Sequence, residues 1–217
     1  MMRSLLPPAV VVVEAEPEMW EAPLLPEEAR LMVRALPRRR REFSAGRACA
    51  RLGLSRLGFP PAPLLSGPDR APIWPQGAVG SITHSAGYCA AAVARESEVR
   101  GLGIDAEANQ PLPEGVAELV CTASEQAWAA TAPGDEVNWP TLIFSAKESV
   151  YKAWHAVTSQ WLGYLDAELS VDCGSGAFEA RLLVPAPAAL GSGFESFRGS
   201  FAVTPAHLFT AVCVSAD

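Results

Sequence analysis

The stretch WPTLIFSAKESVYKAWHAV, residues 139–157, carries the strongest helical pattern in the chain. Its small and apolar residues recur at the spacing of one helical stripe, at Ala146, Val150, Ala153 and Val157. On such a helix Ser145, Glu148 and Lys152 fall at i, i+3 and i+7 and share one face. The stretch therefore predicts a long helix that places a glutamate and a lysine side by side.

Two ordinary explanations compete with a functional one for this polar face. Ser145-x-x-Glu148 matches the residue pattern of a capping box at a helix start. The apolar pattern of the helix already begins upstream, near Pro140, which weakens this explanation. Glu148 and Lys152 can also form a helical ion pair worth about a few tenths of a kcal/mol. In the functional reading Glu148 binds a metal ion and Lys152 binds a phosphate held by the same metal. Taken alone, the segment favours the ordinary explanations.

Composition limits the possible classes of protein. The 217 residues suffice for one large domain or two halves, and 49% hydrophobic with 19% charged residues is typical of a globular chain. The net charge of −7 gives no reason to expect a nucleic-acid partner.

The five cysteines are scattered without a CxxC pair, which favours a reducing compartment. No apolar stretch reaches the ~20 residues of a membrane span, and the N-terminal apolar run fits a strand better than a secretory signal. We therefore expect a cytoplasmic protein with no membrane contact.

Outward from the long helix, the chain alternates helical and strand patterns. The first half is expected to contain a strand at 9–15, helices at 26–36 and 39–58, a loop at 59–79, and two strands within 80–96 joined by a turn at Ala86-Gly87. The second half should contain a strand at 98–107, a short helix at 123–130 capped by Thr122 or Ser124, the long helix, and strands at 167–173, 178–184, 196–204 and 208–215. This order predicts an α+β fold with mostly antiparallel sheets and two halves, residues 1–100 and 101–217.

An acidic pair lies in the strand expected at 98–107. In an extended chain Asp105 and Glu107 point to the same side, whereas Ile104 and Ala106 point to the other. Two like charges in this arrangement repel, and a hard divalent cation such as magnesium would relieve the repulsion. An acidic strand end that reaches solvent would show the same spacing, and the dipeptide alone favours that simpler account.

Histidine and arginine side chains supply further candidate contacts for an anion. His84 lies beside hydroxyl residues in GSITHS (80–85), although a lone histidine is more often structural, and the chain has no GxSxG nucleophile elbow. Arg47 and Arg51 are one helical turn apart and could clamp a phosphate, and Arg70 lies in the loop that leads to the His84 strand. Most of the basic run 38–41 is expected to be a solvated helix start. Neither a Walker loop nor GxGxxG is present.

In order and combined chemistry these segments resemble the Sfp-type 4'-phosphopantetheinyl transferases. The matching segments are GRACAR (46–51), Arg70, GSITHS (80–85), GLGIDAE (101–107), Glu125 and FSAKESVYKAW (144–154). The family signature (V/I)G(I/V)Dx...(F/W)(S/C/T)xKE(S/A)xxK is met from Leu102 to Lys152, with Leu at its first position. Phe144 and the run Lys147-Glu148-Ser149 resemble the corresponding residues of the bacterial subgroup that includes siderophore-pathway enzymes.

The resemblance implies two pseudo-symmetric halves with coenzyme A bound in the cleft between them. It implies that Asp105, Glu107 and Glu148 bind magnesium, with manganese as an alternative, and that Lys152 contacts the pyrophosphate. It also implies coenzyme A contacts from the following side chains: Arg47, Arg51, Arg70, Thr83, His84 and Lys147. A monomer is expected, because two halves in one chain already supply the complete site.

The activity implied is transfer of the phosphopantetheine arm of coenzyme A to a serine of an apo acyl, peptidyl or aryl carrier protein, with release of adenosine 3',5'-bisphosphate. Glu148 is the first choice to take the serine proton and Glu125 the second. The carrier is expected to dock transiently on residues 109–124 and the helix from 139. Two alternatives remain open: a metal-dependent pyrophosphate hydrolase, and a non-catalytic module that binds coenzyme A or a carrier. The intact set Asp105, Glu107, Glu148 and Lys152 argues against the second.

Overall fold

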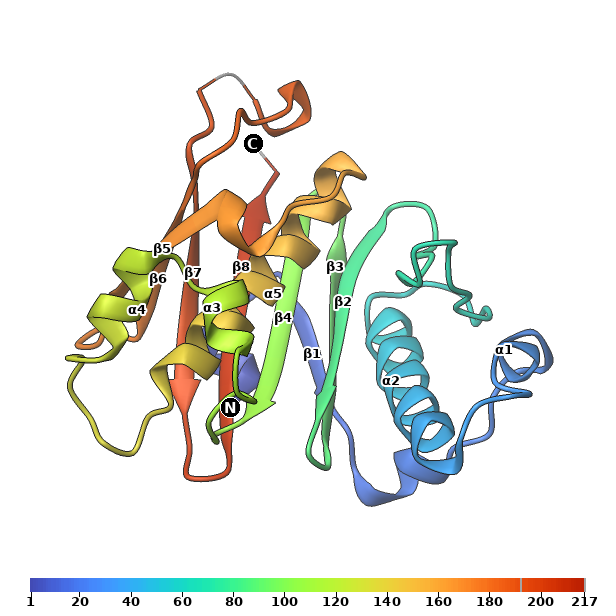
Figure 1. The fold of residues 1–217 in the computed structure, drawn as a ribbon. Coiled ribbons are helices and arrows are strands. Elements are labelled where there is room, and N and C mark those ends of the chain that lie inside the picture. Colours follow the sequence, from blue (N-terminus) through green and yellow to red (C-terminus); the bar gives the residue numbers. More distant parts are fainter. Residues whose placement is uncertain (192, 217) are drawn as a thin grey trace.

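The computed structural model describes residues 1–191 and 193–216, which form two antiparallel sheets (Figure 1). The smaller sheet has the strand order β1-β3-β2, and the larger has the order β4-β8-β7-β6-β5. The strands are β1 Val11–Glu14, β2 Ala78–Ser85, β3 Tyr88–Arg95, β4 Val99–Ala108, β5 Ala167–Asp172, β6 Ala177–Leu182, β7 Ser196–Val203 and β8 His207–Ser215. The predicted α+β class with antiparallel sheets is confirmed. Since β4 begins at Val99 and pairs within the larger sheet, it crosses the boundary expected at residue 100; the division into halves stays a prediction.

A twenty-residue helix packs on each sheet. Helix α2 (Pro37–Arg56) buries Cys49 and Ala50 against Val13 and Ala91 of the smaller sheet. Helix α5 (Trp139–Thr158) covers the larger sheet, where its apolar stripe meets aromatic residues such as Phe178 and Phe197. A third core lies between the sheets and includes Ala92 of β3 and Ile104 of β4. The shorter helices are α1 Pro26–Leu31, α3 Val116–Val120 and α4 Ala123–Ala129, with 3-10 turns at Met2–Leu5, Pro17–Glu21, Tyr164–Asp166 and Ala188–Leu190.

Most of the expected elements appear close to their predicted limits, and one helix is much shorter than expected. The hairpin turn falls at Ala86-Gly87, whose φ angles of 46° and 83° are both positive, as a tight two-residue turn requires. Helix α1 ends at Leu31 instead of Leu36, and Leu36, which precedes Pro37 at the start of α2, is extended as a proline favours for its predecessor. Val33 and Leu36 are consequently 76% exposed and add nothing to the core. Within the described ranges, none of the helices combines the length and apolar character needed to cross a bilayer.

Helix α5 lies unusually close to strand β4, because glycines occupy the contact. A Cβ atom built on Gly103 would overlap the carbonyl oxygen of Ser149 on α5, and one on Gly101 would lie 2.9 Å from the carbonyl oxygen of Ala153. Both obstacles are helix backbone, which cannot rotate away as a side chain can. The glycines of GLGIDAE therefore set the distance between the helix that carries Glu148 and the strand that carries Asp105.

Replacing Gly103 with alanine should destabilise the protein by about 3 kcal/mol or more, because the new methyl group must separate α5 from β4. Urea unfolding measured by circular dichroism would give the change in unfolding free energy. Gly174→Ala is the matched control, since Gly174 is exposed and the nearest atom to an added Cβ is 3.4 Å away. Equal stability of the two variants would contradict the close approach.

Candidate active site

Side-chain hydroxyl groups of β2 join the two sheets along β4. Strand β4 is the edge of the larger sheet, so its outer amides have no partner strand. The hydroxyl of Ser81 accepts a hydrogen bond from the Ile104 amide at 3.1 Å, and the hydroxyl of Thr83 accepts one from the Ala106 amide at 3.0 Å. Alternate residues of β2 thereby satisfy alternate amides of β4, which holds the seam between the sheets in a fixed register.

Asp105 lies at this seam and is contacted from both sides. Its Oδ1 accepts hydrogen bonds from the Thr83 hydroxyl at 3.2 Å and from the Lys152 ammonium at 2.8 Å. Its Oδ2 accepts a hydrogen bond from the buried Ser145 hydroxyl at 2.8 Å, and Lys152 also donates to the Ile104 carbonyl at 2.9 Å. Ser145 and Lys152 thus use the shared helical face expected from the sequence to hold one carboxylate. Ser145 lies inside α5 and does not cap it.

Glu107 and Glu148 are held by separate hydroxyl groups near Asp105. Glu107 Oε2 accepts a hydrogen bond from Ser85 at 2.9 Å, and Glu148 Oε1 accepts one from the Tyr164 hydroxyl. Burial raises the pKa of Glu107, and the charges of Asp105 and, more weakly, Glu148 raise it further. Burial and the Glu148 carboxylate likewise raise the pKa of Tyr164, so its hydroxyl stays protonated and donates. The charges of Asp105 and Glu148 therefore lie near enough to repel that of Glu107.

These carboxylates have the chemistry that a divalent cation prefers. Hard cations bind carboxylate oxygens, and a positive charge among the three groups would offset the repulsion that raises the pKa of Glu107. Within residues 1–191 and 193–216, however, no group of three or more Asp, Glu, His or Cys side chains is arranged so that it could hold a metal ion. Lys152 and the hydroxyl groups of Ser85 and Tyr164 hold the carboxylate oxygens in this arrangement. The donor set fits magnesium, and the metal assignment stays a prediction.

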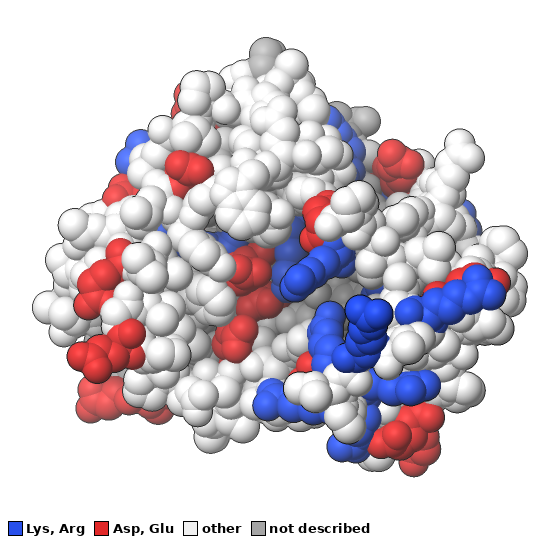
Figure 2. All heavy atoms as spheres, turned by 45° about the vertical axis from the view of Figure 1, so that its right-hand side comes forward, with Lys and Arg blue, Asp and Glu red and all other residues white. Residues whose placement is uncertain are grey.

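A cleft of about 740 Å³ opens beside Lys152. Its walls are the loop 67–77, the first half of β2 and the C-terminal half of α5, and Arg70 contributes to its lining as the resemblance implied. Figure 2 shows a hollow on this face where acidic side chains meet Lys and Arg side chains. Across the cleft His155 of α5 pairs with Asp69 of the loop, with 2.9 Å between Nε2 and Oδ2. The cleft therefore lies between elements from both halves of the chain.

Arg47 and Arg51 both contact other parts of the chain, and their contact with coenzyme A stays a prediction. Arg47 is buried over the ring of Phe43 and donates to the Leu64 carbonyl at 2.7 Å, and burial lowers its pKa to about 10. Arg51 pairs with the fully buried carboxylate of Glu28. Both side chains sit one turn apart, as expected, but they fasten the loop after α2 and helix α1 rather than presenting free charge.

Thr83 and His84 lie on opposite faces of β2. Thr83 is buried and its hydroxyl contacts β4, and its contact with coenzyme A stays a prediction. His84 faces α2, where Arg39 donates to its Nε2 at 2.7 Å and Glu42 lies 3.8 Å from its Nδ1. Burial lowers the pKa of His84, an effect that Glu42 opposes and Arg39 reinforces. The contact between His84 and a coenzyme A phosphate stays a prediction.

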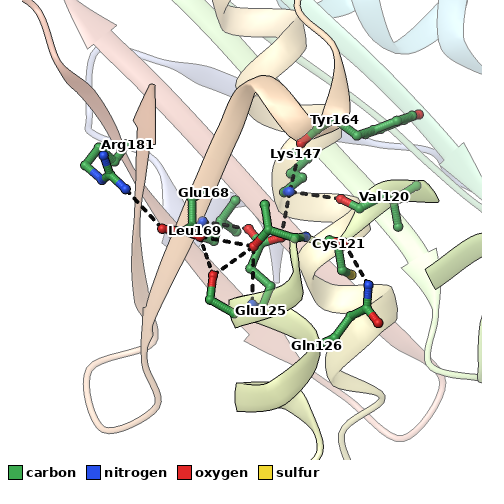
Figure 3. A network of polar contacts seen from close by, with 11 residues as sticks. Val120, Cys121, Glu125, Gln126, Lys147, Tyr164, Glu168, Leu169 and Arg181 are labelled. Atoms are coloured by element: carbon green, nitrogen blue, oxygen red, sulfur yellow. Dashed lines mark hydrogen bonds and ion pairs between the residues drawn. The ribbon is translucent and has the colours of Figure 1, made fainter. Parts of the chain in front are cut away.

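Lys147 and Glu125 form a buried ion pair. The Lys147 ammonium lies 2.7 Å from Glu125 Oε2 and also donates to the carbonyls of Val120 and Tyr164 (Figure 3). Glu125 also accepts from the amides of Thr122 and Leu169, so it caps α4 and anchors β5. Each side chain is almost wholly buried. The pair has a structural role in this arrangement, and the assignments of Lys147 to coenzyme A and of Glu125 to proton transfer stay predictions.

Sequence reasoning missed several polar residues that build the site. Ser81 and Ser85 alternate with Thr83 along GSITHS, and that spacing was the available signal for a row of hydroxyl groups on one face. Tyr164 gave no comparable signal, because it lies in a loop segment sixteen residues from Glu148. Only the folded chain brings its hydroxyl to that carboxylate.

Comparison with known proteins shows the family to which the chain belongs. Residues 27–94 match the 4'-phosphopantetheinyl transferase N-terminal domain, and residues 101–202 match the 4'-phosphopantetheinyl transferase superfamily. The 4'-phosphopantetheinyl transferase Svp of Streptomyces mobaraensis is 47% identical over 221 residues, which cover 100% of this chain and 90% of Svp. The transferase PptT of Mycobacterium tuberculosis is 39% identical over 96% of each chain. Enterobactin synthase component D of Escherichia coli is 32% identical over 67% of this chain and 68% of its own. The chain therefore belongs to the Sfp-type 4'-phosphopantetheinyl transferases.

Removing the charge of Lys147 should destabilise the fold, because it leaves Glu125 buried without its partner. Lys147→Met is expected to cost about 3–5 kcal/mol of unfolding free energy, measured by urea denaturation. The double variant Lys147→Met, Glu125→Gln should recover part of the loss, because the remaining amide carries no charge. A single variant as stable as the wild type would contradict the structural role of the pair.

Proposed function

We propose that the chain transfers the 4'-phosphopantetheine arm of coenzyme A to a serine hydroxyl of an apo carrier protein and releases adenosine 3',5'-bisphosphate. Family membership supports this class of reaction. The observation that carries it is the meeting of Asp105, Glu107 and Glu148 with Lys152 at the edge of the cleft. This pairing of acidic and cationic groups suits a pyrophosphate, whose oxygens gain charge as the bond to the leaving group breaks.

Each residue of the site has a distinct part in this proposal. A magnesium ion, or manganese in its place, would be held by the three carboxylates and would supply positive charge toward the pyrophosphate oxygens. Lys152 is one-quarter exposed and fixed by Asp105 and the Ile104 carbonyl, so its ammonium is positioned to bind the same oxygens. Glu148 takes the proton of the attacking serine. Arg70 binds the nucleotide end of coenzyme A from the cleft wall.

The carrier protein docks beside Glu148 on an exposed apolar surface. Leu119 of α3, Trp161 and Leu165 are 69%, 73% and 51% exposed, and they lie within or next to the expected region 109–124 and the segment after α5. Helix α3 packs on α5 and on the turn Tyr164–Asp166, so the three side chains belong to one part of the molecule. An apolar surface suits the transient docking of a partner, since the net charge of −7 does not attract an acidic one. A cytoplasmic, monomeric enzyme remains the expectation.

Intact mass spectrometry of an apo carrier protein tests the transfer directly. Incubation with this protein, coenzyme A and magnesium should add about 340 Da to the carrier, the mass of the transferred arm. EDTA should abolish the gain, and Glu148→Gln should slow it about 100-fold or more, because a neutral amide neither takes the proton nor binds the cation well. Glu27→Gln is the matched control, since Glu27 is exposed on α1.

Other outcomes of the same experiment would favour the alternatives. Hydrolysis of coenzyme A without any mass gain on several carrier classes would indicate a metal-dependent pyrophosphate hydrolase. Binding of intact coenzyme A without reaction would indicate a non-catalytic binding module.

A charge on the apolar surface should weaken carrier docking and leave coenzyme A binding intact. Leu119→Asp is expected to raise the KM for the carrier about tenfold, which corresponds to about 1.4 kcal/mol, because the carboxylate must lose its water on docking. The KM for coenzyme A should stay unchanged, as measured by steady-state kinetics with each substrate varied. Val33→Asp, on the exposed segment after α1, should change neither constant. An unchanged carrier KM in Leu119→Asp would place the docking surface elsewhere.

A further inference from the structure

Tyr164 is fixed to helix α5 at its backbone and its ring. Its carbonyl accepts a hydrogen bond from the Lys147 ammonium at 2.8 Å, and its ring lies 5.7 Å from the ring of Phe144 between centroids. The turn that begins at Tyr164 is closed by Asp166, whose Oδ2 accepts from the Gly163 amide at 2.7 Å. Because Phe144 and Lys147 both belong to α5, Tyr164 moves with the helix that carries Glu148.

The hydroxyl of Tyr164 is directed at the Glu148 carboxylate. Figure 3 shows the Tyr164 ring extending away from the Lys147 network, so that the carbonyl and the hydroxyl serve different partners. The hydroxyl donates to Glu148 Oε1. Phe144, Lys147 and Glu148 follow within five positions of one helix, so the anchors and the target lie in one rigid unit. The donor position is therefore set by the fold and not by the flexible glutamate chain.

A glutamate in this place needs such a donor. Its side chain has three rotatable bonds, so its own backbone does not hold the carboxylate in one place. A hydrogen bond from a fixed hydroxyl holds one oxygen and leaves the second free to bind another group. Partners of this kind orient carboxylates that bind metals, and their loss costs about 10–100-fold in metal affinity or activity.

We infer that Tyr164 is a positioning residue, which fixes one oxygen of the Glu148 carboxylate through its hydroxyl group and leaves the other oxygen free for the proposed cation. The inference rests on the proposed function for the identity of the site, and it assigns to Tyr164 no contact with the reacting atoms. The aromatic ring and the carbonyl have a separate structural task, which a phenylalanine would also perform. The hydroxyl alone carries the positioning role.

Tyr164→Phe isolates that hydroxyl. We expect the affinity for Mn²⁺, measured by electron paramagnetic resonance in the presence of coenzyme A, to fall about tenfold. The kcat of transfer at limiting magnesium should fall by a similar factor and recover in part at high magnesium, while the KM for the carrier stays unchanged. Tyr88→Phe is the matched control, because Tyr88 lies in β3 with its ring against Phe209. Its metal affinity should equal that of the wild type.

A double-variant cycle separates positioning from a general loss of structure. In a Glu148→Gln background, Tyr164→Phe should cause no further loss of metal affinity, because its effect passes through the carboxylate. Equal effects of Tyr164→Phe in both backgrounds would overturn the inference, as would unchanged Mn²⁺ affinity in the single variant. A wild-type protein that transfers nothing would contradict the proposed function instead, and the Mn²⁺ comparison would still decide the role of Tyr164.

Discussion

The close approach of α5 to β4 is the constraint on which the rest of the site depends. Gly103 permits it, because any side chain there would collide with the Ser149 carbonyl of the helix. At this separation a short serine and a long lysine can both reach Asp105 on the strand. A helix displaced by the width of one methyl group would lose the short contact from Ser145 first. The glycine thus matters to the site through distance, although it carries no functional group.

Hydroxyl groups complete the same arrangement from the other side of β4. Ser81, Thr83 and Ser85 satisfy two edge amides and contact both strand carboxylates, so the seam between the sheets also orients the acidic residues. The seam explains how a site with repelling charges persists: each carboxylate has a neutral or cationic donor fixed by the backbone. The two sheets meet here through side chains and not through a continuous ladder of backbone hydrogen bonds, and Lys152, which contacts this seam, also lines the cleft.

Much of this organisation could be predicted from the sequence, and the failures have a common cause. The spacing of apolar residues and the positions of turn-forming residues located α2, α5, the β2–β3 hairpin and β4, because these patterns follow from local geometry. The shared face of Ser145 and Lys152 was also correct. The sequence did not show which cations are buried: Arg47 and Lys147 resemble ligand-binding cations there, but in the structure both are buried and hydrogen-bonded within the chain. A sequence pattern places a charge on a helix face without telling which faces another element will cover.

The sequence by itself determined the family, the α+β class and the residues that could carry phosphoryl-transfer chemistry, because these depend on residue types at short, regular spacings. Tertiary structure alone decided which charges remain available. It enclosed Lys147 with Glu125, left Lys152 at the cleft, and brought Tyr164 to Glu148. The physical reason is that burial and hydrogen-bond pairing arise between segments distant in the chain. Their partners are fixed only when helix and sheet pack together.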